Sequence, residues 1–131
     1  MHPTEKETTM TQFRPLDPAF PIERQLGLEA GPVVLINLFT LDKTDEKALL
    51  EAWKDDAEFM KQQPGFISTQ LHRAVGDSPA YLNYAVWETI AAFRAAFNHP
   101  AFRAKLSVYP SSVVAAPHLF QRVAVSGICV A

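Results

Sequence analysis

The stretch Tyr81–Phe102, YLNYAVWETIAAFRAAFNHPAF, decides the fold because its hydrophobic period changes halfway along. Its first part, Tyr81–Trp87, is aromatic and aliphatic, which is typical of a half-buried strand. Thr89 can cap a helix with its hydroxyl, and the apolar residues beyond it fall at helical spacing: Ile90, Phe93 and Phe97. A strand that runs directly into a helix leaves Trp87 at the corner, where its ring either walls a pocket or fills the core.

Further elements precede and follow this stretch in the order strand, helix, strand, strand, helix, strand. We expect strands at residues 33–41, 66–75 and 118–125, a helix at 44–62, a second short helical piece at 100–107 and a loop over 109–117. This βαββαβ order predicts an α+β, ferredoxin-like fold, with a four-stranded antiparallel sheet and both helices on one face.

Length and proline content divide the chain into an arm and one domain. With 131 residues a single domain is expected, over residues 31–131. Prolines at positions 15, 18, 21 and 32 exclude a continuous helix or central strand over residues 13–32. Residues 1–30 are therefore expected to form an N-terminal arm that is partly disordered. The apolar side chains of the arm indicate that it packs on the domain or on a partner subunit.

Composition argues against several classes of protein. The formal net charge of −2 gives no electrostatic reason to expect nucleic acid or an anionic membrane as a partner. No apolar run is long enough to cross a bilayer, and the polar N-terminus lacks the apolar centre of a signal peptide. Cys129 is the only cysteine, which rules out an intrachain disulfide and a cysteine-based zinc cluster. The cytoplasm is the simplest compartment.

One face of the predicted sheet is apolar although no helix is expected to cover it. Six side chains share this face: Val34, Ile36 and Leu38 from the first strand, and Leu82, Tyr84 and Val86 from the third. A patch of this kind is too apolar to remain in water. We therefore expect a homodimer in which two sheets pack face to face.

Polar residues in apolar surroundings are the best candidates for chemistry, because no phosphate loop, nucleophile elbow or metal motif is present. Asn37 shares a strand face with apolar residues, and a buried amide without a partner costs about 1–3 kcal/mol. It therefore pairs within the core, meets a water or lines a pocket whose ligand it binds. Asn83 is a similar candidate. Phe93, Phe97 and Phe102 either fill the core or wall a pocket for a flat, apolar molecule.

Three segments resemble the antibiotic biosynthesis monooxygenase family, over about residues 30–125: VVLINLFTL, QQPGFISTQLHR and YAVWETIAAFRAAFNHPAF. The aromatic-Trp-Glu corner, followed by a helix and a His-Pro-x-Phe step, is the most specific part. The resemblance implies a dimeric α+β barrel, with a pocket between sheet and helices in each subunit. It also implies that molecular oxygen oxidises an electron-rich aromatic, such as an anthrone, naphthol or quinol, without a metal, flavin or other cofactor.

Candidate residue roles follow from this resemblance and from the pattern together. Asn37 and Trp87 match the family's first-strand asparagine and third-strand tryptophan, so Asn37 would orient a substrate oxygen and Trp87 would wall the pocket. His72 or His118 is the candidate proton acceptor. Further candidate substrate contacts are Asn83, Phe93, Phe97, Phe102 and Tyr109.

Two other functions stay open. A non-catalytic small-molecule binder or stress-response dimer would keep the pocket but need no proton acceptor. A branch of the same superfamily degrades heme with a tryptophan in the second helix and an iron-ligating histidine, and an ungapped alignment places Ala96 and Leu106 at those positions. Without that imidazole the iron lacks an obvious axial ligand, so a cofactor-independent monooxygenase is our leading hypothesis.

Overall fold

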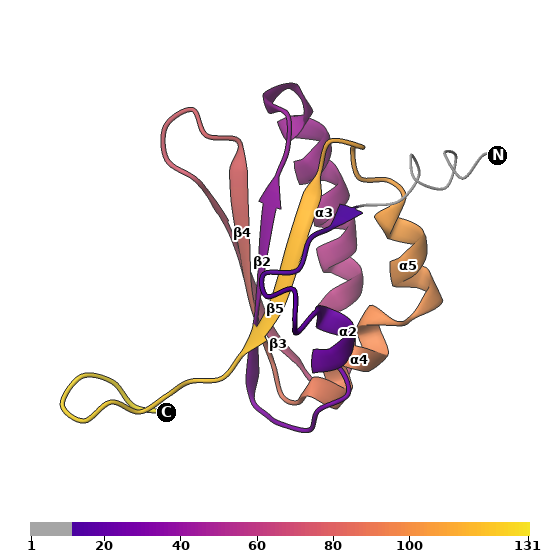
Figure 1. The fold of residues 1–131 in the computed structure, drawn as a ribbon. Helices are drawn as coiled ribbons and strands as arrows, with labels where there is room; N and C mark the ends of the chain where they lie inside the picture. The colour runs from indigo at the N-terminus through magenta and orange to yellow at the C-terminus, as the bar shows by residue number, and fades with distance from the viewer. Residues whose placement is uncertain (1–11) are drawn as a thin grey trace.

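The computed structural model describes residues 12–131, in which helices cover one face of a five-stranded sheet (Figure 1). The strands are β1 (Gln12–Phe13), β2 (Val33–Thr40), β3 (Phe66–Arg73), β4 (Ala80–Trp87) and β5 (Val114–Phe120). The helices are α2 (Ile22–Gln25), η1 (Lys43–Asp45), α3 (Glu46–Met60), α4 (Ile90–Phe97) and α5 (Pro100–Leu106). Within residues 12–131, no helix has the length and hydrophobicity that a membrane crossing requires.

The sheet order β1-β5-β2-β4-β3 confirms the predicted α+β, ferredoxin-like fold. β2 runs antiparallel to β4 and β5, and β3 runs antiparallel to β4. The register places Asn37 opposite Asn83, so their side chains share one face of the sheet. The prediction of four strands is wrong, because β1 adds a fifth strand in parallel with β5. This strand is only two residues long, so it leaves no alternating pattern in the sequence.

The last strand, β5, begins before the predicted residues 118–125 and includes Pro117, so the predicted loop and strand boundaries are wrong here. A proline argues against a central strand because it cannot donate a hydrogen bond. In β5, however, the Ala115 carbonyl faces away from β2 and accepts from Arg14 N at 2.8 Å. The Pro117 nitrogen, two residues later, points to the same outer edge and therefore costs the β2–β5 pairing no hydrogen bond.

Two glycines allow the corner between β4 and α4 to close tightly. Gly65 has a φ of +86°, and a Cβ there would overlap Cβ of Ala92. A Cβ on Gly31 would overlap the carbonyl oxygen of Glu88. As predicted, Thr89 caps α4, since its hydroxyl accepts from Ala92 N at 3.0 Å. The end of β4 is thereby fixed relative to α4.

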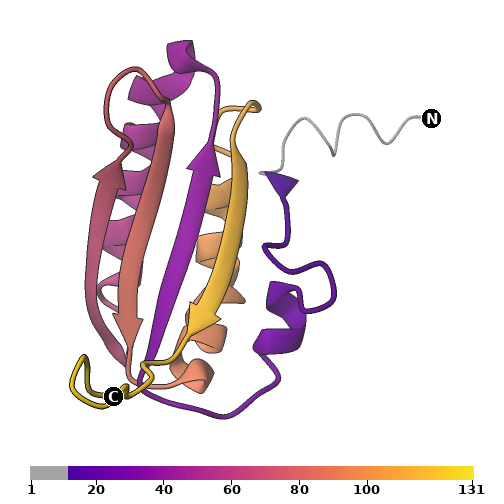
Figure 2. The same cartoon turned by 60° about the vertical axis from the view of Figure 1, so that its left-hand side comes forward.

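Residues 12–30 pack along the outer edge of β5 (Figure 2). Phe13 of β1 stacks on Phe97 of α4, with ring centroids 6.2 Å apart. Gln25 of α2 is buried, and its Oε1 accepts from Leu119 N at 2.7 Å. This part of the predicted arm therefore contacts its own domain. The disorder expected at the start of the arm falls mainly on residues 1–11, which lie outside the described residues.

The face of the sheet opposite the helices carries no helix anywhere in residues 12–131 (Figures 1 and 2). The apolar side chains that were expected there are half-buried or exposed, and Leu38 and Tyr84 keep 40% and 38% of their surface in water. The C-terminal residues 121–131 extend away from the domain (Figure 1) and expose Val123, Val125, Ile128 and Val130. Both the open face and this tail therefore present apolar surface to solvent.

Candidate functional site

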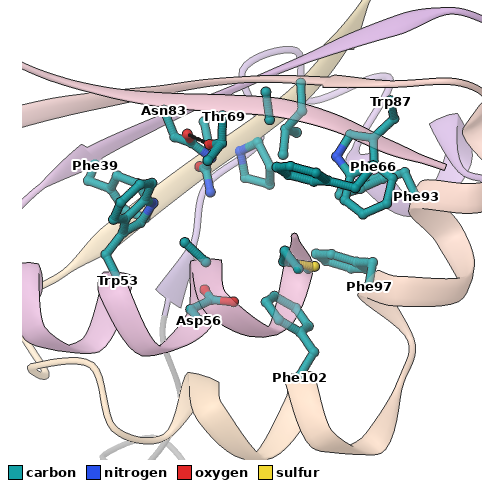
Figure 3. Close-up of a pocket in the computed structure, with 16 residues that line it drawn as sticks. Phe39, Trp53, Asp56, Phe66, Thr69, Asn83, Trp87, Phe93, Phe97 and Phe102 are labelled. Carbon is teal, nitrogen blue, oxygen red and sulfur yellow. Dashed lines mark hydrogen bonds between the residues drawn. The ribbon is translucent and has the colours of Figure 1, made fainter. Parts of the chain in front are cut away.

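A pocket lies between the sheet and the helices α3, α4 and α5 (Figure 3). Its cavity volume is about 60 Å³, and its mouth is open to solvent. The lining residues are Leu35, Asn37, Phe39, Trp53, Asp56, Ala57, Met60, Phe66, Thr69, Asn83, Ala85, Trp87, Phe93, Phe97, Phe102 and Pro117. Among the lining residues, those from α4 and α5 are fully buried, whereas those from α3 and β3 are half-buried. The pocket therefore opens between α3 and β3.

The deep end of the pocket is a continuous series of aromatic rings. Trp87 at the end of β4 makes edge-to-face contacts with Phe66 and Phe93, at centroid distances of 5.4 and 5.5 Å. The series continues along the helices from Phe93 to Phe97 and then to Phe102, at 5.4 Å for each step. Rings that interlock in this way hold one another in place. The pocket therefore offers preformed apolar walls to a flat ligand.

Polar side chains interrupt this lining at four positions: Asn37, Asp56, Thr69 and Asn83. Thr69 and Asn83 are paired with each other, because the Thr69 hydroxyl donates to Asn83 Oδ1 at 2.5 Å. Asn37 Oδ1 is buried, and no group in the described part of the chain donates a hydrogen bond to it. Such an acceptor costs about 1–3 kcal/mol when it is left unpaired. A ligand hydroxyl that donates to Asn37 would recover this cost.

Asp56 of α3 presents a second buried oxygen without a partner. Its Oδ2 accepts from the Tyr109 hydroxyl at 2.8 Å, whereas its Oδ1 has no donor among residues 12–131. Figure 3 shows Asp56 on the helix side of the pocket, across from Thr69 and Asn83 on the sheet. Asp56 and Asn37 also line a smaller cavity beside this pocket, so both lie where the two cavities adjoin.

Burial raises the pKa of Asp56 from 3.8 to about 6. The hydrogen bond from Tyr109 and the charge of Lys105 lower this pKa, and the neighbouring Asp55 raises it. Lys105 Nζ lies 2.9 Å from Asp55 Oδ2, so its charge is already paired. Burial also raises the pKa of Tyr109 far above its ordinary value, which keeps the phenol protonated as a donor. Because the pKa of Asp56 is about 6, its carboxyl group is mainly ionised at neutral pH.

The structure places most of the predicted substrate contacts around the pocket. Trp87, Asn83 and the three phenylalanines line it together with Asn37. Tyr109 lies behind Asp56 instead, where it lines the smaller cavity and stacks on Phe39 with centroids 6.2 Å apart. It reaches the pocket only through its hydrogen bond to Asp56.

The two histidines that were candidate proton acceptors lie on the other face of the sheet. His72 is exposed and pairs in register with Leu82, which belongs to the open face. His118 pairs in register with Ile36 of the same face, and its Nδ1 accepts from Gln25 Nε2 at 3.1 Å. Neither imidazole is among the residues that line the pocket.

The residues aligned with the heme-degrading branch are apolar and buried. Ala96 and Leu106 belong to the core, with exposures of 1% and 5%. His99 caps α5, where its Nδ1 accepts from Ala101 N at 3.0 Å. The lining of the pocket contains neither a histidine nor a cysteine, so these residues do not fit heme ligation by imidazole or thiolate.

Asp56 lines the pocket but was not among the candidate residues predicted from the sequence. It lies three residues after Trp53 and four before Met60, and both of these line the pocket from α3. A carboxylate within an apolar helical stripe is therefore the signal that the sequence contained. Asp55 lies next to it in the chain but is exposed, and only the helical phase distinguishes the two.

Most of the region that forms the pocket is similar in sequence to known proteins. Residues 32–105, more than half of the chain, match the family model described as antibiotic biosynthesis monooxygenase. A deoxynogalonate monooxygenase from Streptomyces nogalater is 33% identical over 76 residues, which are 58% of this chain and 64% of that protein. The chain thus matches slightly less than two thirds of the length of this relative.

Solved structures resemble the fold over a longer region. The cofactor-independent oxygenase SnoaB from Streptomyces nogalater has a TM-score of 0.66 and 27% identity, over 75% of this chain and 99% of its own. A proposed monooxygenase from Shewanella loihica has a TM-score of 0.62 and 31% identity, over 76% of this chain and 100% of its own. A protein from Mycobacterium tuberculosis shares the fold at a TM-score of 0.60 and 15% identity, over 74% and 100%.

Proposed function

We propose that this chain, which belongs to the antibiotic biosynthesis monooxygenase family, oxidises a small hydroxylated aromatic molecule with molecular oxygen and without a cofactor. The family and the description of SnoaB as a cofactor-independent oxygenase support the reaction class. The aromatic lining of the pocket supports a flat substrate.

One observation carries the proposal: the buried, unpartnered oxygen of Asn37 inside an aromatic pocket. A side-chain amide accepts through its oxygen and donates through its nitrogen, so Asn37 is suited to bind a hydroxyl or carbonyl on a ring. In a purely apolar core this amide would only destabilise the fold, because burying an amide without a hydrogen-bond partner costs free energy. In this proposal Asn37 orients the substrate, and Trp87 packs against its ring system.

The proposed reaction needs no external reductant. At an anthrone-like position the balance is CH₂ + O₂ → C=O + H₂O, so the substrate supplies both electrons and both hydrogens that reduce the second oxygen atom to water. The protein contributes orientation, exclusion of water and a group that accepts a proton.

Oxygen uptake tests the proposal. The purified chain is incubated with a panel of anthrones, naphthols and quinols in chelator-treated buffer, and oxygen consumption is compared between wild type and Asn37→Ala. Asn98→Ala is the matched control, because Asn98 is exposed and lies outside the pocket, where it accepts from Arg103 at 2.9 Å. We expect at least one substrate to be consumed, with kcat/KM lowered about 10- to 100-fold in Asn37→Ala and unchanged in the control.

Two results would contradict this proposal. Equal rates for wild type and Asn37→Ala would remove Asn37 from the mechanism. A panel member that raises the melting temperature without any oxygen uptake would instead favour a non-catalytic binding protein.

The open face of the sheet leads us to propose a homodimer as the functional form. Leu38 and Tyr84 are among the apolar side chains that this face exposes. The apolar C-terminal tail leaves the end of β5 on the same side of the sheet as the open face (Figure 1). A second copy packed sheet to sheet would remove these surfaces from water. Sedimentation velocity at micromolar concentration is expected to show a dimer, and a monomer would contradict the proposal.

A further inference from the structure

We infer that Asp56 is the group that takes the hydroxyl proton of the aromatic ligand, with Tyr109 as its positioning residue. This inference deepens the proposed function and rests on it for the oxidation, but the binding part is testable without turnover. Asp56 comes from the helix side of the pocket, whereas Asn37 comes from the sheet, so a ligand between them can contact both.

The geometry of Asp56 leaves one oxygen fixed and the other available. Tyr109 donates to Oδ2 at 2.8 Å and is itself held by stacking on Phe39. Oδ1 is buried and has no donor within residues 12–131, although the residue lines the pocket. Such a carboxylate can accept a hydrogen bond from a ligand at Oδ1 in an environment with little water.

The charges around Asp56 leave its carboxylate able to accept a proton near neutral pH. Tyr109 faces it from the segment after α5, Lys105 acts on it from α5, and Asp55 acts on it from α3 itself. The sheet contributes only neutral polar groups to the pocket, those of Asn37, Thr69 and Asn83. Burial therefore dominates and raises the pKa of Asp56 to about 6, closer to that of an aromatic hydroxyl than an exposed aspartate would be.

The same charges restrict the class of ligand. No lysine, arginine or histidine is among the residues that line the pocket, whereas Asp56 contributes a negative charge. A ligand with its own carboxylate would meet repulsion here without any compensating cation. The pocket therefore fits a neutral ring that carries at least one hydroxyl donor for Asp56. A second hydroxyl on the ring would be able to donate to Asn37 Oδ1.

The proton transfer balances within the site. The O–H bond of the ligand breaks, its proton moves to Asp56 Oδ1, and the electron pair stays on the ring oxygen as an aryloxide. Molecular oxygen, the oxidant of the proposed reaction, then receives one electron from this electron-rich aryloxide. The negative charge moves from the carboxylate to the ligand, so no additional buried charge is created.

Anaerobic binding of 1-naphthol and its methyl ether, 1-methoxynaphthalene, tests the inference. The two probes share the ring, but only 1-naphthol can donate to Asp56. At about pH 8 we expect wild type to prefer 1-naphthol by about tenfold or more, and Asp56→Asn to lose most of this preference. Asp55→Asn, an exposed neighbour on the same helix, is the matched control and is expected to keep it.

The pH profile of oxygen uptake supplies a second readout. Wild-type kcat/KM is expected to fall as the pH drops below about 6, because Asp56 becomes protonated. Tyr109→Phe should move this acid limb to higher pH, since the hydrogen bond that lowers the pKa of Asp56 is lost. Asp56→Asn should remove the limb and lower the rate about 100-fold or more.

The outcomes separate the inference from the proposed function. If Asp56→Asn keeps both the preference for 1-naphthol and the acid limb, the assignment of Asp56 is overturned. If the preference disappears in Asp56→Asn but no aromatic supports oxygen uptake in wild type, Asp56 is supported as the hydroxyl acceptor and the oxygenase proposal is overturned. An acid limb that Tyr109→Phe leaves in place would overturn the positioning role of Tyr109.

Discussion

Asp56→Asn is expected to make the fold more stable at neutral pH, because the buried carboxylate destabilises it. The pKa of Asp56 rises from 3.8 to about 6 on folding, and each tenfold step in a proton equilibrium is about 1.4 kcal/mol. The ionised group therefore costs about 3 kcal/mol of unfolding free energy at pH 8. Asparagine removes this charge and keeps an oxygen that can accept from Tyr109. The unpaired N–H groups of the asparagine destabilise the fold by about 1 kcal/mol. The free energy of unfolding of Asp56→Asn at pH 8 is therefore expected to exceed that of wild type by about 2 kcal/mol.

The sign of the pH dependence follows from the raised pKa. Between pH 3.8 and about 6 the folded state holds a proton on Asp56 that the unfolded state has lost, so wild-type stability falls as the pH rises through this window. The carboxylate costs only about 0.5 kcal/mol at pH 4 by the same arithmetic. The difference between Asp56→Asn and wild type should therefore change by about 2.5 kcal/mol from pH 4 to pH 8.

Urea unfolding followed by tryptophan fluorescence measures this difference, because Trp53 and Trp87 both belong to or pack on the core. Wild type, Asp56→Asn and the control Asp55→Asn are compared at about pH 4 and pH 8, at one protein concentration so that any self-association is held constant. A difference between Asp56→Asn and wild type that stays the same at both pH values would refute the assigned burial of Asp56. If Asp56→Asn gains stability and also loses activity, Asp56 lowers the stability of the fold while it is required for function.

Three further predictions concern the scaffold. Gln25→Ala should lower the free energy of unfolding by about 2–3 kcal/mol in urea titrations, since its buried amide makes three hydrogen bonds and each contributes about 1 kcal/mol; a loss below about 0.5 kcal/mol would show that the arm is not needed for stability. Gly65→Ala should lower the melting temperature more than Gly76→Ala, because both have positive φ but only Gly65 is crowded; an equal effect would argue against the tight corner. Leu38→Asp combined with Tyr84→Asp should convert the proposed dimer to a folded monomer in sedimentation velocity, and a persistent dimer would place the interface elsewhere.

The sequence predicted those elements whose apolar residues recur with the period of a strand or of a helix. The change of period across Tyr81–Phe102 correctly indicated β4, the cap at Thr89 and α4, because strand and helix place apolar residues at different spacings. It failed at β5, where a proline concealed a strand whose outer edge does not pair with β2. The proline rule concerns hydrogen-bond direction, and direction depends on which neighbours a strand acquires.

The candidate site divides in the same way. Trp87, Asn83 and Asn37 were identified because polar or aromatic residues stand out within a strand, and all three line the pocket. His72 and His118 were singled out for their chemistry alone, and the register of the sheet places both on the helix-free face. A shift of one residue along a strand changes the face, so chemistry without register does not locate a side chain.

By itself the sequence determined the ferredoxin-like fold and the aromatic corner, since hydrophobic periodicity is a local property that each element carries. Only the tertiary structure decided which polar groups share the pocket. Asp56 and Tyr109 lie far apart in the chain, and their pairing depends on how α3 packs beside α5. Burial and the pKa of a carboxylate depend on neighbours from several elements, which a linear pattern does not specify.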